Sequence, residues 1–182
     1  MKVYILRADS NRYQTLVPVR ADTWQEELAR FDGTPFGTSW SPVDVQVSHE
    51  DEKNKDLLPS DFPSLIPYIP VFSRRAIEVL GDLLQGNGEI LPLNCTEGVY
   101  FAFNVTRIVD ALDTSRSQLK LFQSTGRIMR VIRYEFLTDK LSSFTIFKLP
   151  QFDKSEVFVT DGFVQRVQEH NLTGFVFNLV WI

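Results

Sequence analysis

The stretch of residues 61–113 constrains the fold most, because it specifies a helix together with both of its ends. Between residues 74 and 85, apolar side chains recur at helical spacing, and polar side chains fall on the opposite side. Ser73 stands where a side-chain oxygen accepts a free backbone N–H at the start of a helix, and Gly86 stands where a left-handed residue ends one. The pattern therefore predicts an amphipathic helix over residues 74–85.

Short strand patterns fill most of the remaining chain, with few helices between them. Asn104 stands as the N-cap of a short helix over residues 105–112, and Asp161 caps another helix whose apolar residues face inward. A further short helix is predicted over residues 24–31. Strands are predicted over residues 2–7, 43–48, 89–93, 99–103, 119–123, 127–137, 145–149, 156–160 and 175–182.

Several of these segments carry more specific expectations. Apolar residues occur on both faces of residues 175–182, which predicts a strand covered on both sides. Prolines in residues 57–70 predict an extended connector across the surface of the core. Alternation over residues 127–137 places Ile128, Ile132, Tyr134 and Phe136 on one face, with Arg130 as the exception on that face. Together the patterns predict a single α+β domain, residues 1–182, with a largely antiparallel sheet and a few short amphipathic helices packed on it.

A set of motifs resembles one known family. The motifs are FPS, PVFSRRAIEVL, LPL and YFAFNVTRIVDALD, followed by IFKLP, VFVTDGFVQRVQEHNLTGF and a final apolar strand. They resemble the Imm11 family of immunity proteins, also called DUF1629, most clearly over residues 61–181 and only loosely over residues 1–60. Such proteins are encoded beside polymorphic toxins and neutralise them. The resemblance therefore implies a bacterial immunity protein with a toxin or effector domain as its partner, and it transfers no site residue.

The composition of the chain indicates which kinds of partner and which cellular compartment fit it. The chain has 19 basic and 23 acidic residues, which disfavours nucleic-acid binding and mildly favours a basic partner. Its single cysteine, Cys95, cannot form an intramolecular disulfide, so a reducing compartment fits best. The first residues lack the pattern of a signal peptide, and no apolar stretch is long enough to span a bilayer. We expect a cytoplasmic protein without a membrane partner.

Residues that carry catalytic chemistry are scarce. His49 and His170 are the only histidines, and neither has a nucleophile nearby in the predicted elements. The sequence contains no zinc-binding spacing and no phosphate-binding glycine loop, so we expect no metal and no cofactor. Asp110 and Asp113 are three residues apart near a predicted helix end and could act as an acid and base pair. Equally, they suit a turn or an ion pair with Arg107.

Three groups of residues are candidates for contact with a partner. The charged segment 49–56 could complement a basic toxin site or could simply be a solvated loop. Trp40 could be an exposed aromatic anchor or a plug at the end of the core. An arginine cluster in the strand that begins at Arg127 could grip an acidic surface or could simply face water. The candidate partner-binding residues are Trp40, Glu50, Asp51, Glu52, Asp56, Arg130 and Arg133.

These observations favour a non-enzymatic protein that occludes a toxin stoichiometrically. Two alternatives stay open. One is an enzyme that reverses the toxin's modification through carboxylates such as Asp110 and Asp113. The other is a binding module unrelated to any toxin.

Overall fold

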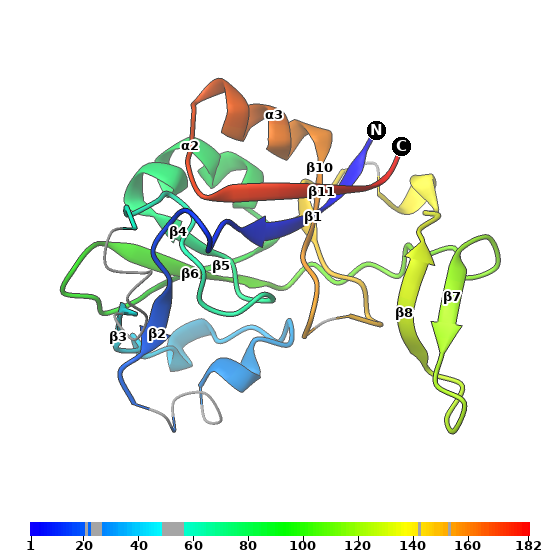
Figure 1. Ribbon diagram of the computed structural model, residues 1–182, viewed down its shortest axis with the longest axis horizontal. Helices are drawn as coiled ribbons and strands as arrows, with labels where there is room; N and C mark the ends of the chain where they lie inside the picture. The colour runs from blue at the N-terminus through cyan, green and yellow to red at the C-terminus, as the bar shows by residue number, and fades with distance from the viewer. Residues whose placement is uncertain (21, 23–26, 49–56, 142, 153) are drawn as a thin grey trace.

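The computed structural model describes residues 1–20, 22, 27–48, 57–141, 143–152 and 154–182. Over these residues the predicted α+β class is confirmed: two α-helices accompany several antiparallel sheets (Figure 1). No helix in the described ranges is long and apolar enough to cross a membrane.

The widest sheet joins the two ends of the chain. Its strand order is β11-β1-β10-β9, and every neighbouring pair is antiparallel. Val3 lies opposite Trp181, so the termini lie close together (Figure 1). The strands are β1 (Val3–Ala8), β9 (Ile146–Phe147), β10 (Phe158–Thr160) and β11 (Phe175–Trp181).

A second sheet leads into the first long helix. Its order is β4-β6-β5, with β4 (Val71–Ser73), β5 (Gly88–Pro92) and β6 (Tyr100–Val105). Helix α2 (Arg74–Leu84) follows β4 directly and packs beside α3 (Asp161–Glu169), as Figure 1 shows. Two smaller pairs complete the strands: β2 (Leu16–Pro18) with β3 (Val45–Val47), and β7 (Gln118–Leu121) with β8 (Ile128–Arg133).

Helix α2 confirms the prediction from its caps. The Ser73 hydroxyl accepts the N–H of Ala76 at 3.1 Å, and Gly86 adopts a φ of 75° just after the helix. The buried side chains are Ala76, Leu80 and Leu84. Because the local signals and the apolar face agree, this element could be predicted from the sequence nearly to the residue.

The prediction of a helix over residues 105–112 was wrong. Asn104 and Val105 are the last residues of β6, where Val105 lies opposite Gly88, and no helix follows them. The Asn104 side chain is fully buried and donates to the Thr34 carbonyl and the Glu89 carboxylate. The pairing of β6 with β5 thus continues through the residue that resembles a helix cap, and tertiary contact overrides the local signal.

Two other expectations need correction. Strand β11 lies at an edge of its sheet, and Leu179 is 47% exposed, so the strand is not covered on both sides. The proline-rich connector does not run across the surface, because Phe62, Leu65 and Ile69 are buried among core residues. From the segment predicted as a helix over 24–31, the described part contains a 3₁₀ turn at Leu28–Arg30.

The core consists of three hydrophobic clusters that share the two larger sheets. Along β6, Phe103 belongs to the first cluster and Ala102 to the second. In β10, Val159 belongs to the first cluster and Phe158 to the third. Alternate residues of a strand point to opposite faces, so each sheet separates two clusters.

The hairpin β7–β8 projects from one side of the molecule (Figure 1). Its register shifts twice. Gln118 and Leu119 pair with Arg133 and Val131, and Lys120 and Leu121 pair with Arg130 and Ile128, so one β8 residue is left unpaired at each shift. Ile132 and Met129 are the extra residues of these bulges. The expected face of residues 127–137 was therefore wrong, since Ile132 is exposed while Ile128, Val131 and Tyr134 pack on the third cluster.

Candidate partner-binding surface

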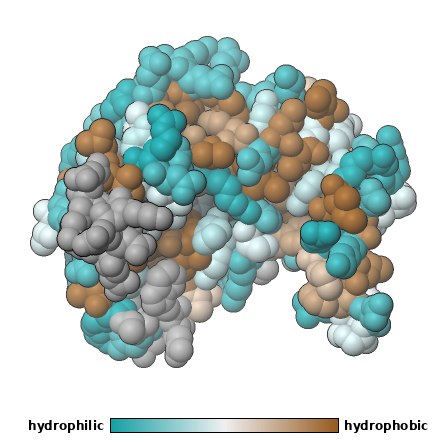
Figure 2. Space-filling view, viewed as in Figure 1, coloured by the Kyte–Doolittle hydropathy of each residue, from teal (hydrophilic) through white to brown (hydrophobic). Residues whose placement is uncertain are grey.

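Residues 118–133, here called the basic hairpin, concentrate positive charge on a projecting element. This stretch contains four cations and no acidic residue: Lys120, Arg127, Arg130 and Arg133. Each of these side chains belongs to an exposed residue. Figure 2 shows the hairpin standing off from the body, with a notch between its free end and the rest of the surface. The structure thus brings Arg130 and Arg133 together on one strand, as the sequence indicated.

Two of the cations face each other across the strands. Lys120 and Arg130 are direct cross-strand partners, so their side chains share one face of the hairpin. Like charges placed opposite one another destabilise a sheet. Neither side chain has an ion-pair partner among the residues that the structure describes. Sequence reasoning missed Lys120, because its position opposite Arg130 depends on the register of the hairpin.

Arg133 is only loosely compensated. Its Nε atom lies 3.7 Å from a carboxylate oxygen of Glu135, and one guanidinium nitrogen donates to the Arg116 carbonyl at 3.5 Å. Both contacts are at the long end of their range, and 67% of the Arg133 side chain is exposed. The guanidinium therefore remains accessible to a partner.

Apolar side chains are exposed among these cations. Leu121 is 47% exposed, Phe122 45%, Met129 39% and Ile132 54%. Phe122 begins the connection between the strands, where its N–H donates to the Arg127 carbonyl at 2.9 Å. Met129 and Ile132 are the two bulge residues, and contiguous exposed apolar surface can mark a site of protein interaction.

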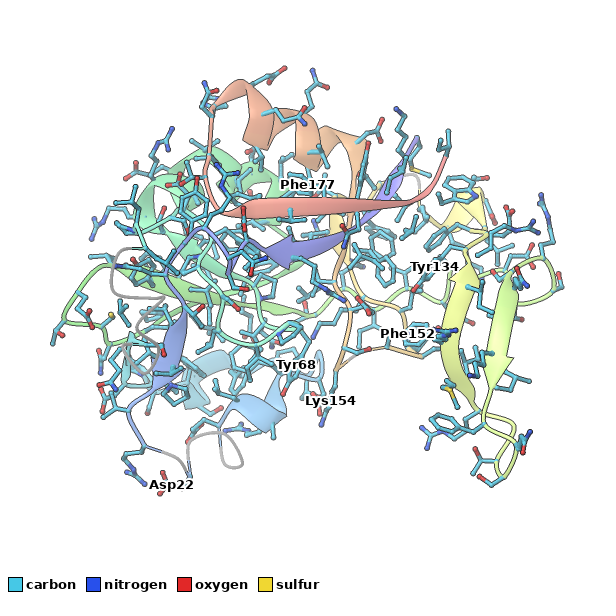
Figure 3. All side chains as sticks on the ribbon, in the orientation of Figure 1. Asp22, Tyr68, Tyr134, Phe152, Lys154 and Phe177 are labelled. Atoms are coloured by element: carbon cyan, nitrogen blue, oxygen red, sulfur yellow. The ribbon has the colours of Figure 1, made fainter. Side chains whose placement is uncertain are left out.

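The base of the hairpin is anchored in the core. Leu119, Ile128 and Val131 pack against the third cluster. Tyr134 stacks on Phe136 with ring centroids 5.8 Å apart, and it lies where the hairpin meets the body (Figure 3). Burial raises the pKa of Tyr134 to about 12. One face of the hairpin is thus held in place, while its cationic face and its turn are free to meet a partner.

Trp40 lies in a different part of the molecule. Its ring centroid is 5.0 Å from that of Phe36, and its indole N–H donates to the Pro92 carbonyl at 3.0 Å. The side chain packs against the second cluster, which fits the core plug that the sequence allowed. In Figure 1, the turn before it, Gly37–Ser39, lies far from the basic hairpin. The structure does not bring Trp40 together with Arg130 and Arg133.

The acidic candidates Glu50, Asp51, Glu52 and Asp56 lie outside the described residues, as does His49. His170 is exposed after the last turn of α3, and its carbonyl accepts a hydrogen bond from Arg75 at 2.7 Å. Cys95 is a half-buried free thiol that packs against the second cluster. No group of three potential metal ligands gathers within the described part of the chain.

Asp110 and Asp113 have separate roles. The Asp113 carboxylate accepts the Ser115 hydroxyl at 2.6 Å and the backbone N–H groups of Ser115 and Arg116. The hydrogen bond from the Ser115 hydroxyl is the main cause that lowers the pKa of Asp113. Asp110 instead accepts from the Gln151 side chain at 3.2 Å. Asp113 is thus the turn former that the sequence offered as an alternative to an acid and base pair.

Part of the chain that includes this surface is similar to a known protein family. The sequence model of the immunity protein family Imm11 matches residues 94–180, slightly less than half of the chain. The matched stretch contains the whole basic hairpin, helix α3 and most of β11. This match confirms the resemblance read from the motifs and indicates a function in toxin immunity, with a toxin as partner. No curated protein matches the chain.

Proposed function

We propose that this protein binds the toxic domain of a cognate bacterial toxin in the cytoplasm and neutralises it by occlusion of the active site or of substrate entry. The observation that carries this proposal is the Imm11 match over residues 94–180. In this mechanism each molecule of toxin requires one molecule of immunity protein, and no cofactor or turnover is involved. The proposal therefore describes a binding protein and not an enzyme.

Interface size sets a physical requirement on this mechanism. A stable protein interface uses roughly 20–30 residues from each partner. The basic hairpin spans residues 118–133, so it can supply only part of such an interface. Neighbouring body surface must contribute the rest, and the notch beside the hairpin in Figure 2 offers concave surface for a partner to enter.

The remaining candidate residues belong to the same proposal. Glu50, Asp51, Glu52 and Asp56 would meet basic groups of the toxin and would speed association by electrostatic steering. Trp40 would contribute only if the interface reached the second cluster. Arg130 and Arg133 would meet acidic groups. A partner surface with separate acidic and basic areas would fit both charged regions.

Titration of toxin activity tests the proposal. The toxin domain encoded beside this protein's gene would be assayed with increasing amounts of purified protein, and complex formation would be followed by size-exclusion chromatography with light scattering. We expect activity to reach its minimum at one equivalent, together with a one-to-one complex. Protection by far less than one equivalent, without a stable complex, would instead support enzymatic reversal of the toxin's effect.

A further inference from the structure

We propose that the cationic face and the turn of the basic hairpin dock on an acidic, partly apolar surface of the toxin domain. This inference rests on the proposed function, and it names the part of the protein that makes the contact and the chemistry of the surface it meets.

Uncompensated charge is the first argument. Lys120 and Arg130 are direct cross-strand partners, an arrangement that costs stability through repulsion. The chain has more acidic than basic residues overall, yet residues 118–133 hold four cations and no acid. Lys120 and Arg130 have no ion-pair partner in the described part of the chain, so a negatively charged partner would reduce the repulsion between them. The charge of the hairpin therefore selects an acidic surface.

Apolar exposure is the second argument, and it favours a protein over a nucleic acid. Met129 and Ile132 are exposed apolar residues of β8 that lie next to Arg130 and Arg133 in the chain. Covering aliphatic side chains with another apolar surface is favourable, whereas proteins hold single-stranded nucleic acids largely by stacking bases on aromatic side chains. Phe122 alone supplies an aromatic ring among the exposed hydrophobic residues of the hairpin. Arginine, methionine and phenylalanine, all present on this surface, are residue types enriched in protein interfaces.

Rigidity is the third argument. The inner face of the hairpin packs on the third cluster through Leu119, Ile128 and Val131, and the Trp181 indole donates to Glu135 at 3.2 Å just beyond β8. An anchored element loses little conformational entropy when it binds. The hairpin can therefore present its outer groups to a partner in one fixed arrangement.

Charge reversal on the hairpin tests the inference. The probe is the adjacent toxin domain, purified as an inactive variant, and its association with Lys120→Glu/Arg130→Glu would be measured by surface plasmon resonance at low and high salt. We expect association to slow by about tenfold or more, with a weaker dependence on salt than in the unchanged protein. The matched control is Arg12→Glu/Arg74→Glu, which changes net charge equally at two exposed arginines outside the hairpin.

A second variant tests the apolar contribution. Phe122→Ser/Ile132→Ser should raise the dissociation rate constant by about tenfold, because lost apolar contacts act mainly on dissociation. Thermal unfolding of every variant would show that the fold is retained. If charge reversal perturbs the fold, Lys120→Gln/Arg130→Gln replaces it and removes charge without adding acid.

The outcomes separate the two proposals. If the unchanged protein fails to bind the toxin domain, the proposed function fails. If it binds, and the hairpin variants bind as tightly as the control, docking by the hairpin is overturned while the proposed function stands. Tight binding of a labelled single-stranded RNA that is lost only in the charge-reversed variant, with toxin binding intact, would assign the hairpin to nucleic acid instead.

Discussion

Glu89 joins three parts of the chain through one carboxylate. It accepts the N–H groups of Phe36 and Gly37, each at 2.8 Å, and the side-chain amide of Asn104 at 3.0 Å. Burial opposes ionisation of this carboxyl, but the three hydrogen bonds outweigh that effect and lower the pKa of Glu89. Hydrogen bonds to a charged group contribute more than neutral ones, so we expect Glu89→Gln to reduce the free energy of unfolding by about 2 kcal/mol at neutral pH.

Acid provides the check on this assignment. A carboxyl whose pKa is lowered by folding stabilises the protein above its unfolded pKa, and this contribution is lost as pH falls through the folded value. The difference in free energy of unfolding between the unchanged protein and Glu89→Gln, measured by urea unfolding, should therefore shrink as pH falls from about 6 to about 3. An unchanged gap would show that the ionised form of Glu89 is not what stabilises the fold.

Tyr134 should make the protein sensitive to alkali. Its pKa is raised to about 12, chiefly by burial and then by the charge of Glu156. An unfolded tyrosine ionises near pH 10, and the folded protein keeps Tyr134 protonated to higher pH. The stability that this preference contributes is complete below about pH 10 and is lost as pH rises through the folded pKa. Between about pH 8 and about pH 12, the free energy of unfolding should therefore fall by about 2 kcal/mol less in Tyr134→Phe than in the unchanged protein.

Urea unfolding across this range, together with absorbance near the tyrosinate band, measures both the loss and the ionisation. Other tyrosines with raised pKa values, Tyr68 and Tyr100, are present in both proteins, so their effect cancels in the comparison. Parallel stability curves for the two proteins would refute the role assigned to Tyr134.

The sequence was least informative for residues whose role depends on distant partners. Nothing near Asn104 in the chain indicates that its amide reaches Thr34, seventy residues away. Lys120 likewise becomes notable only because Arg130 lies opposite it. The turn around Asp113 is different, since Ser115 and Arg116 are local partners, and the sequence offered a turn there as one of its alternatives.

At the scale of elements, two glycines at one helix test the capping argument. Gly81 lies inside α2 and Gly86 just beyond its end at a φ of 75°, and an added Cβ at either position meets nothing within 4 Å. Because the space is equally open, only backbone conformation distinguishes them. We expect Gly81→Ala to stabilise the protein by about 1 kcal/mol, through higher helix propensity. Gly86→Ala should destabilise it by about 1 kcal/mol, because a left-handed backbone strains an L-residue.

Thermal unfolding monitored by circular dichroism measures both changes. Each alanine serves as the control for the other, since they add the same methyl group to neighbouring positions. Shifts of the same sign would mean that Gly86 is not held in the left-handed conformation.

Elements defined by local signals could be predicted, and those defined by pairing could not. Helix α2 has a cap, an apolar face and a glycine stop within a dozen residues. The bulges at Met129 and Ile132 leave no comparable signal, because alternation in the sequence assumes a regular ladder. Those same bulges expose part of the candidate surface, so its charge was visible in the sequence but its apolar part was not.

At the scale of the whole molecule, the sheet topology makes the first residues indispensable. Strand β1 lies between β11 and β10, so a segment from the start of the chain separates two strands from its end. The sequence suggested a core of residues 61–182 that resembles the family, and the family match itself begins at residue 94. Strand order depends on contacts between distant segments, which sequence periodicity does not encode.

This topology predicts that residues 61–182 do not fold alone. Removing residues 1–60 deletes β1, whose Val3 and Leu6 are almost completely buried in two different clusters. It also deletes half of the buried members of the second cluster: Leu16, Leu28, Phe31, Phe36, Val43, Val45 and Val47. Strands β10 and β11 would then expose unpaired edges and apolar side chains, a state that favours aggregation. We therefore expect no cooperative unfolding transition in the isolated fragment.

Complementation distinguishes a missing strand from a damaged chain. When residues 1–60 and 61–182 are produced together as separate chains, we expect them to associate and to regain cooperative unfolding, because every pairing of β1 can form again between two chains. The measurement is chemical unfolding followed by tryptophan fluorescence, with the intact protein as reference. Cooperative unfolding of residues 61–182 alone would show that the family-like part is an independent domain, and that β1 only completes a sheet that is already stable.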